Sequence, residues 1–356
     1  ATADMRVLRS EGPRRGRAVL PRVREGARLI ADLTRRSGPP AHLCARLSTE
    51  RAAPPPLRVY LAFAAVYIIW GSTYFGIREA LTGFPPFLLG GLRFLLAALC
   101  MFVWCIATGV NVRPGRDLWK SVLAGFLLLF VGNGAVIWAQ RTLPSSLVAI
   151  LIAAAPLSFV LLDRPQWGVN FRSPATLLGV GFGLGGVLLL FWDRITAQLG
   201  AEAVSPEVSA MLVLLLGIIG WPAGSLIAKY RPAALPNVVN SAWQMAAGAL
   251  MFLAVSAGRG EPVGFVWGAV PPRAWLALAY LVVFGSIIGY SAYIFLLGVR
   301  PATQVSTYAY VNPVVAVLLG LWLGDERLGA KEVAGLLVIL GVWRMINLAK
   351  YRKARN

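Results

Sequence analysis

Residues 70–93 read WGSTYFGIREALTGFPPFLLGGLR, and residues 221–244 read WPAGSLIAKYRPAALPNVVNSAWQ. In both stretches a tryptophan is followed by a proline 15 positions later. The position 23 residues after the tryptophan holds Arg93 in the first stretch and Gln244 in the second. This shared register indicates that one unit of sequence occurs twice in the chain.

Further landmarks repeat beyond these stretches. Each copy has two prolines 12 residues apart and two glycines 6 residues apart: Pro144, Pro156, Gly179 and Gly185 in the first, and Pro301, Pro313, Gly335 and Gly341 in the second. Each copy also contains five apolar segments that approach or exceed the roughly 20 residues needed to cross a bilayer. A unit with an odd number of spans enters its second copy from the opposite face of the membrane. The copies are therefore predicted to be inverted repeats, the architecture of alternating-access carriers.

Composition places the chain in a lipid bilayer. Apolar residues make up 58% of the 356 positions and charged residues 14%, whereas a soluble domain carries about 25% charge. We predict an all-α membrane protein with ten spans, near residues 58–77, 86–107, 118–139, 145–162, 174–192, 208–228, 238–257, 274–297, 302–323 and 333–348.

The net charge of +19 is assigned to membrane orientation, and no nucleic-acid partner is expected. Many basic residues lie in the first 58 positions and most others flank spans, with an excess on the side of the N-terminus. This bias predicts that both termini are cytoplasmic. The expected parts are a basic, disordered tail, a first five-span repeat, a linker, a second five-span repeat and a basic C-terminal tail, at residues 1–57, 58–192, 193–207, 208–349 and 350–356.

The N-terminal tail has other interpretations. Residues 19–36 could form a basic amphipathic helix on an anionic membrane surface. An Arg-rich leader is also typical of a transit peptide, although Glu11, Glu25 and Asp32 weaken that interpretation. An over-extended gene start is a further alternative.

Several motifs stand out in the two halves: YIIWGSTYF (67–75), PP (85–86) with GLRF (91–94), VGNG (131–134), LVVFGSIIGYSAY (281–293), TYAYVNPVVAVLLG (307–320) and GDERL (324–328). These motifs resemble the EamA branch of the drug/metabolite transporter superfamily, and within it the YedA-like inner-membrane transporters. The resemblance covers all ten predicted spans. It implies ten helices in two inverted five-helix repeats, export of small metabolites, and a central cavity formed mainly by spans one, three, four, six, eight and nine.

One segment departs from the family pattern. After span four the family has a short turn containing Gly-Glu, which the second half keeps at residues 324–328. The first half instead reads LDRPQWGVN at residues 162–170. The resemblance therefore supplies no template for the inner end of span four.

Polar and aromatic side chains inside the spans are the candidates for substrate binding. Such groups cost free energy in hydrocarbon unless they pair or face water. Helical spacing groups them into stripes on four spans. The stripes hold Trp70 and Tyr74 with Tyr67 on span one, Asn133 and Gln140 with Trp138 close by on span three, Tyr290 and Tyr293 with Ser286 on span eight, and Gln304, Tyr308 and Asn312 on span nine.

The duplication provides an internal control for the stripe on span nine. At an offset of 157, its three polar residues correspond to Leu147, Leu151 and Ala155, which are all apolar. Because the polar stripe occurs in one half and not in the other, it is assigned to ligand recognition and not to a requirement of the fold. The alternative is that the stripe bonds to neighbouring helices, with Asn312 stabilising a kink at Pro313.

Arg93 is the one charge well inside a predicted span. It lies seven residues past Pro86, roughly 10 Å deep at 1.5 Å per residue. A role in attracting a carboxylate or another anionic group of the substrate is one interpretation. The other is an arginine that extends outward to the interface or bonds to carbonyls at a helix end.

Prolines and glycines inside the spans are given structural roles. Pro156 and Pro313 recur in both halves and are predicted to kink helices that line the cavity. Gly179, Gly181, Gly183 and Gly185 suit close helix contact. These glycines are assigned to packing, with a homodimer surface as one alternative.

The sequence lacks the residue patterns of a carboxylate proton relay, of a metal site and of common catalytic centres. No Asp or Glu falls in the central part of a predicted span, and the single histidine, His42, lies in the tail. Cys44, Cys100 and Cys105 show no spacing typical of a metal site or a disulfide framework. HExxH, paired buried aspartates and a serine with a histidine base are missing from the spans. We expect no cofactor, no metal and no enzymatic activity.

These observations predict a transporter that exports small metabolites across the cytoplasmic membrane by alternating access. Its partners would be membrane lipid and a small-molecule substrate. Without a buried acid as counter-charge, the expected substrates are neutral, zwitterionic or weakly anionic compounds such as amino acids, held by the aromatic side chains. A passive channel or facilitator for small solutes is the alternative.

Overall fold

The computed structural model describes residues 54–172 and 205–324, with single positions 174, 178, 181, 185, 329, 333, 334, 337 and 341. Contacts place the described residues in one unit, Pro54–Asn356. Residues 1–53 of the predicted tail (1–57), residues 193–204 of the predicted linker (193–207), most of the spans at 174–192 and 333–348, and the C-terminal tail lie outside the described residues.

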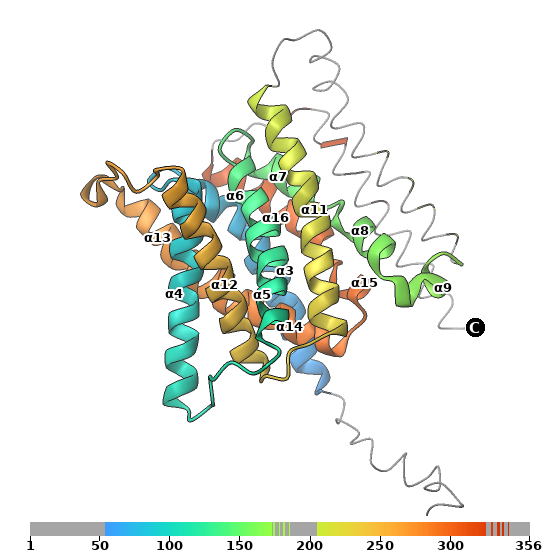
Figure 1. Cartoon of the computed structure of the whole chain (residues 1–356). Coiled ribbons are helices and arrows are strands. Elements are labelled where there is room, and N and C mark those ends of the chain that lie inside the picture. Colours follow the sequence, from blue (N-terminus) through green and yellow to red (C-terminus); the bar gives the residue numbers. More distant parts are fainter. Residues whose placement is uncertain are drawn as a thin grey trace, which may run out of the picture. The chain divides into compact units, whose positions relative to one another are not determined.

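The described residues form helices and contain no strand (Figure 1). The helices of the first half are α3 (Pro56–Ala80), α4 (Pro86–Ala107), α5 (Leu118–Gly125), η1 (Phe126–Asn133), α6 (Gly134–Ala139), α7 (Ser145–Ile152), α8 (Ala155–Leu162), η2 (Arg164–Gln166) and α9 (Trp167–Asn170). Those of the second half are α11 (Pro206–Tyr230), α12 (Asn237–Gly258), η3 (Trp267–Ala269), α13 (Pro272–Tyr280), η4 (Leu281–Gly289), α14 (Tyr290–Val299), α15 (Ala302–Val305) and α16 (Tyr308–Leu323).

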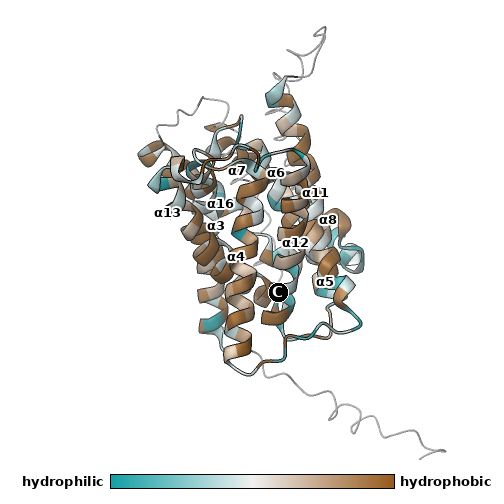
Figure 2. Cartoon of the chain, turned by 60° about the vertical axis from the view of Figure 1, so that its left-hand side comes forward, coloured by the Kyte–Doolittle hydropathy of each residue, from teal (hydrophilic) through white to brown (hydrophobic). Residues whose placement is uncertain are grey.

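Eight helical segments are long and apolar enough to cross a membrane. They confirm the predicted spans one to four and six to nine. Large apolar side chains remain exposed on them, such as Trp104, Leu216, Leu250 and Trp322, which are 61–80% exposed. Hydrophobic residues predominate along the helices, while hydrophilic ones gather at helix ends and in connections (Figure 2). This distribution suits a surface in contact with lipid.

Two helices that occupy matching positions in the two halves run antiparallel. Near the N-terminus of α4, Phe94 stacks on Phe252, with ring centroids 5.8 Å apart. Further along α4, Phe102 contacts Trp243, which lies earlier on α12, at 5.1 Å. As the chain advances along one helix, its contacts therefore move backwards along the other.

Packing between the halves is reciprocal. In the first half α3 contacts η4, α14 and α16, which belong to the third and fourth spans of the second half. In return, α11 contacts η1, α6 and α8, which belong to the third and fourth spans of the first half. Such exchange of equivalent contacts is the pattern of an interface around a two-fold axis.

The third span of each half contains a π-helical segment, η1 in the first and η4 in the second. π-Helical turns are rare and often occur at functional sites, because the wider turn changes which side chains share a face. Their occurrence in both halves indicates that the wide turns belong to the repeated unit.

The fourth span of each half is interrupted, at different places. In the first half, Ala153 and Ala154 separate α7 from α8, and Pro156 follows as an early residue of α8. In the second half, the interruption lies at Ser306 and Thr307, and Pro313 sits inside the continuous helix α16. The hydroxyls of Ser306 and Thr307 donate to backbone carbonyls three residues earlier, and such bonds compete with helix formation.

Glu261 caps the start of α4 from a loop of the second half. Its carboxylate oxygens accept from the backbone N–H groups of Phe87 at 3.3 Å and Leu88 at 2.8 Å. Ser256 Oγ donates to the same carboxylate at 2.9 Å. These bonds satisfy N–H groups that a helix leaves without internal partners, and they place negative charge at the positive end of the helix dipole.

Replacing Glu261 by alanine is therefore expected to destabilise the protein by about 1–2 kcal/mol. Thermal unfolding of the purified protein in detergent would show a lower melting temperature. Glu79→Ala is the control, because the contact of the Glu79 carboxylate with the exposed Arg273 is long, at 3.9 Å. Equal melting temperatures for the two variants would refute the capping role.

Candidate functional site

A small cavity of about 60 Å³ lies between the two halves. In the conformation described it is smaller than typical small-molecule sites, which measure roughly 300–1,000 Å³. Its walls come from spans one to four of the first half and from spans six and nine of the second. The lining residues are Trp70, Thr73, Tyr74, Ile77, Arg93, Gly132, Asn133, Val136, Ile152, Ala155, Gly217, Ile218, Trp221, Tyr308 and Asn312.

Arg93 provides the charge of this cavity. Its side chain is buried, with 2% of the residue exposed. Nε donates to Ser286 Oγ at 2.9 Å and Nη1 to Asn133 Oδ1 at 3.2 Å. These two bonds reach the third span of each half and use two of the five N–H donors of a guanidinium. The arginine therefore points into the bundle and bonds to side chains, unlike an arginine that extends to the interface.

No acidic residue pairs with Arg93 in the part of the chain that the structure describes. A buried charge without an opposite partner is costly, and neutral oxygens of Ser286 and Asn133 offset only part of that cost. The cavity is therefore electrostatically suited to a ligand that carries a carboxylate or another anionic group.

Aromatic rings form another wall of the cavity. The repeat-related Trp70 and Trp221 meet edge to face, with ring centroids 5.2 Å apart. Tyr308 contacts Trp70 in the same way at 5.0 Å. Contact between equivalent residues of the two halves places these tryptophans near the axis that would relate the halves. The rings offer apolar and stacking contact to a ligand.

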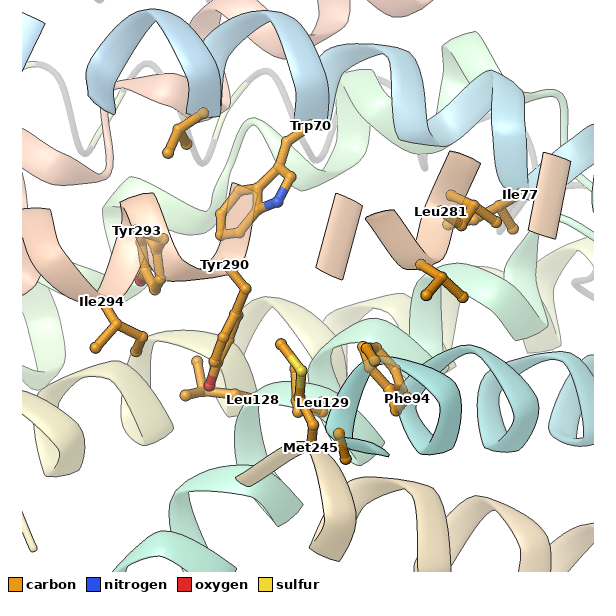
Figure 3. Close-up of a cluster of buried hydrophobic side chains, with 14 of the residues drawn as sticks. Trp70, Ile77, Phe94, Leu128, Leu129, Met245, Leu281, Tyr290, Tyr293 and Ile294 are labelled. Carbon is orange, nitrogen blue, oxygen red and sulfur yellow. The ribbon is translucent and has the colours of Figure 1, made fainter. Parts of the chain in front are cut away.

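Tyr290 and Tyr293 stand behind this wall, outside the lining of the cavity. Figure 3 shows both tyrosines in the same buried cluster as Trp70. The Tyr293 ring contacts Trp70 at 4.9 Å, and its hydroxyl bonds to Ser225 at 2.6 Å and accepts from Trp221 Nε1 at 3.1 Å. The Tyr290 hydroxyl donates to Gln244 Oε1 at 2.6 Å. Both tyrosines thus hold the aromatic wall from behind.

Asn312 lines the cavity and also supports the helices. With its amide nitrogen facing the two carbonyls, Nδ2 donates to Tyr308 O at 3.0 Å and to Tyr67 O at 3.1 Å. The second bond joins α16 to α3. Asn312 therefore bonds to a neighbouring helix, as the structural interpretation of this stripe expects. It also lines the cavity, where a ligand could contact it.

Gln304 lies away from Tyr308 and Asn312. It is exposed on the short helix α15, whereas the other two are buried on α16. The expected single stripe on span nine is therefore wrong for Gln304, because the interruption at Ser306 and Thr307 breaks the helical register.

Trp138 and Gln140 lie toward the end of span three, beyond the cavity. The guanidinium groups of Arg141 and Arg259 stack on the Trp138 ring, at 4.3 and 5.1 Å from its centroid. Gln140 follows the end of α6 and borders a separate pocket near Pro85 and Phe265. The expected shared face of Asn133 and Gln140 therefore does not form one site, because Gln140 lies past the end of α6, about 10 Å further along the span at 1.5 Å per residue.

The structure adds two residues that the sequence interpretation left out of the site, because Trp221 and Thr73 line the cavity. Ser286, expected on the stripe of span eight, bonds to Arg93. The signal for Trp221 was its place as the repeat partner of Trp70. Span two contributes through Arg93, while span eight, expected in the lining, supplies supporting contacts instead.

The chemistry of the cavity is that of a binding site. No group of three or more His, Cys, Asp or Glu suited to a metal ion occurs among the described residues. The lining offers one guanidinium, amide and hydroxyl groups, and aromatic faces. The guanidinium can bond to a carboxylate or another anionic group, and the aromatic faces can contact apolar groups.

Comparisons with known proteins agree with this architecture. The model of the EamA-like transporter family matches residues 57–192 and 208–348. The "Uncharacterized inner membrane transporter YedA" of Escherichia coli K12 is 37% identical over 298 residues, covering 83% of this chain and 92% of its own length. A "Probable amino-acid metabolite efflux pump" of the same strain is 25% identical, over 81% of this chain and 95% of its own.

The fold is also found in a solved structure. A protein with a crystal structure superposes with a TM-score of 0.60 at 19% sequence identity, covering 82% of this chain and 97% of the other. Two matches to one family model, together with the 37% identical relative, account for both halves of the sequence. The chain is a multi-pass membrane transporter and belongs to the EamA-like transporter family.

Proposed function

We propose that this transporter exports small zwitterionic or weakly anionic metabolites, with amino acids as the first class, across the cytoplasmic membrane. The observation that carries the proposal is Arg93, a buried guanidinium without an acidic partner among the described residues, on the wall of a cavity between the halves. A carboxylate would supply its missing counter-charge, and the aromatic wall would contact the rest of the ligand. The names of two relatives, an inner membrane transporter and an amino-acid metabolite efflux pump, support this compartment and substrate class.

The proposed mechanism is alternating access by rocking of two inverted repeats around the cavity. Antiparallel α4 and α12 and the reciprocal packing of α3 and α11 support it. Trp70 and Trp221 meet where the halves join, so their contact would persist in both states while the helix ends open in turn. In this scheme both termini are cytoplasmic.

Counterflow in liposomes tests this function. Purified protein is reconstituted in vesicles loaded with an unlabelled amino acid, and uptake of the same labelled amino acid is measured for a panel of amino acids. A carrier is expected to show saturable uptake that an excess of internal substrate accelerates. Protein-free vesicles and vesicles without internal substrate are the controls.

A passive channel is the alternative because a cavity with aromatic walls could open at both ends. Uptake that neither saturates nor responds to internal substrate would favour the channel. Specific transport of quaternary ammonium dyes in place of amino acids would refute the proposed substrate class, because a fixed cation repels them.

A further inference from the structure

A second pocket opens near one end of the bundle, and it shares no lining residue with the cavity that holds Arg93. Its volume is about 600 Å³, within the roughly 300–1,000 Å³ of small-molecule sites. The lining residues are Arg78, Leu81, Thr82, Gly83, Phe84, Pro85, Pro86, Gln140, Arg141 and Phe265. Two guanidinium groups and an amide therefore share this pocket with apolar side chains.

The second pocket and the cavity are neighbours along three spans. On α3, Ile77 lines the cavity and the next residue, Arg78, lines the pocket. On span three, Val136 lines the cavity, and Gln140 lines the pocket one helical turn further along. On α4, seven residues separate Pro86 at the pocket from Arg93 in the cavity, roughly 10 Å along the helix axis. The pocket is therefore adjacent to the cavity, toward this end of the bundle.

Positive charge gathers beside this pocket. The guanidinium groups of Arg141 and Arg259 stack on the same ring, that of Trp138, at 4.3 and 5.1 Å from its centroid. Neither guanidinium forms an ion pair with a described residue. Glu261, two residues after Arg259, is engaged at the start of α4. Like charges held beside one ring repel each other, and a bound oxyanion would reduce that repulsion.

Gln140 brings a buried amide to the same pocket. The residue is 6% exposed, and its Oε1 and Nε2 are buried without a hydrogen-bond partner among the described residues. Polar groups that are buried and unsatisfied cost free energy. A rotation of this side chain toward the pocket would let Nε2 donate to an oxyanion bound beside Arg141, and the new bond would offset part of that cost.

We propose that this pocket is a second anion-binding site, which binds the carboxylate of an exported metabolite at a point beyond Arg93. Arg141 pairs with the carboxylate, Gln140 Nε2 donates to it, and Pro85 and Phe265 contact apolar parts of the molecule. The choice of an exported metabolite as the ligand rests on the proposed function. The headgroup phosphate of an anionic lipid is an oxyanion too, and the experiment below separates the two sources.

Protection of a cysteine from labelling tests the site without transport. Thr82→Cys, at an exposed position of the pocket lining, is introduced with Cys44, Cys100 and Cys105 replaced by serine. The protein is placed in phosphatidylcholine nanodiscs, where reagents reach both faces, and reaction with a cationic methanethiosulfonate is followed. An equimolar mixture of amino acids without cysteine is expected to slow the reaction. The amides of the same amino acids lack the carboxylate and should have no effect.

Variants of the pocket identify the groups that bind. Arg141→Gln is expected to raise the half-protecting concentration about fivefold, the upper range for an exposed pair of charges. Arg273→Gln is the matched control and should leave this concentration unchanged, because Arg273 is an exposed arginine that contacts Glu79 and lies outside the pocket lining. Equal protection in the parent protein and Arg141→Gln, or equal losses in Arg141→Gln and Arg273→Gln, would overturn the site.

Gln140→Leu tests the amide separately from the fold. Protection should weaken, while the melting temperature should not fall, because the change removes polar atoms that have no partner. Undiminished protection in Gln140→Leu would refute the role of the amide.

Two further arms locate the anion and identify its source. Protection should persist in Arg93→Gln, and its loss there would place the anion in the cavity and refute a second site. Labelling that slows when phosphatidylglycerol is added to the nanodiscs, but not with amino acids, would assign the pocket to lipid and overturn the proposed ligand. Nanodiscs report binding and not transport. A failure of counterflow would therefore refute the proposed function, while the protection result would still decide this site.

Discussion

Replacement of Gly125 by alanine is expected to destabilise the folded protein by about 3 kcal/mol, the upper part of the range for an overpacked core. A Cβ atom at this position would overlap the backbone carbonyl oxygen of Gln244 and lie 3.0 Å from its Cα. A side chain could rotate away from such a contact, but the backbone of α12 cannot. Helices α5 and α12 would have to separate, and with them the junction of the two halves.

Thermal unfolding in detergent and the yield of monodisperse protein measure this effect. Gly298→Ala is the matched control, because Gly298 also lies in a membrane-length helix but a methyl group there would have no described atom within 4 Å. The control should unfold like wild type. If both variants unfold at the wild-type temperature, the close approach of α5 and α12 is not what holds the halves together.

Replacing Arg93 by glutamine is expected to reduce counterflow of carboxylate-bearing amino acids at least tenfold. A hydrogen bond to a charged group contributes about 1.5–3 kcal/mol, and 1.4 kcal/mol corresponds to a factor of ten in affinity. Glutamine is the residue at the repeat-related position, Gln244, which bonds to Tyr290. Because an amide can still bond to Ser286 and Asn133 and removes an unpaired charge, the fold should tolerate the change.

Substrates without a carboxylate are the control for the proposed role of Arg93. Amides of the same amino acids lack the carboxylate, so any residual exchange of the amides should be equal in wild type and Arg93→Gln. Arg93→Lys, which keeps the charge without the planar fork, should fall between the two. Undiminished exchange of zwitterionic and anionic amino acids by Arg93→Gln would dismiss the anion-binding role.

The apolar stretches and the internal repeat of the sequence predicted the helices, because the positions of membrane helices depend on local sequence. Apolar stretches fixed the eight described spans to within a few residues. The repeat also pointed to Trp70 and Arg93, which now line one cavity. Arg93 stood out in the sequence as a charge inside a predicted span. Trp70 stood out because its repeat partner is also a tryptophan, Trp221.

Departures from regular helical geometry are the part that spacing could not predict. Assigning Gln304 to the same face as Asn312 assumed an unbroken helix, and side-chain hydrogen bonds at Ser306 and Thr307 break it.

Tertiary contacts were equally hidden from the sequence. Asp163 lies outside the predicted spans, yet it is buried and accepts a hydrogen bond from Tyr230 of the other half. A search for acids in the centre of spans could not find it, because Asp163 lies past the end of α8.

Sidedness of two equivalent connections tests the inverted-repeat carrier most directly. Gly115 lies between spans two and three, and Gly260 lies between spans seven and eight; at both, a side chain would extend into space free of the described residues. Single cysteines at these positions, in the protein without its native cysteines, are labelled with an impermeant maleimide in right-side-out and inside-out vesicles. We predict that Gly115→Cys reacts from the cytoplasmic side and Gly260→Cys from the opposite side. Labelling of both from the same side would contradict the inversion and the transport mechanism built on it.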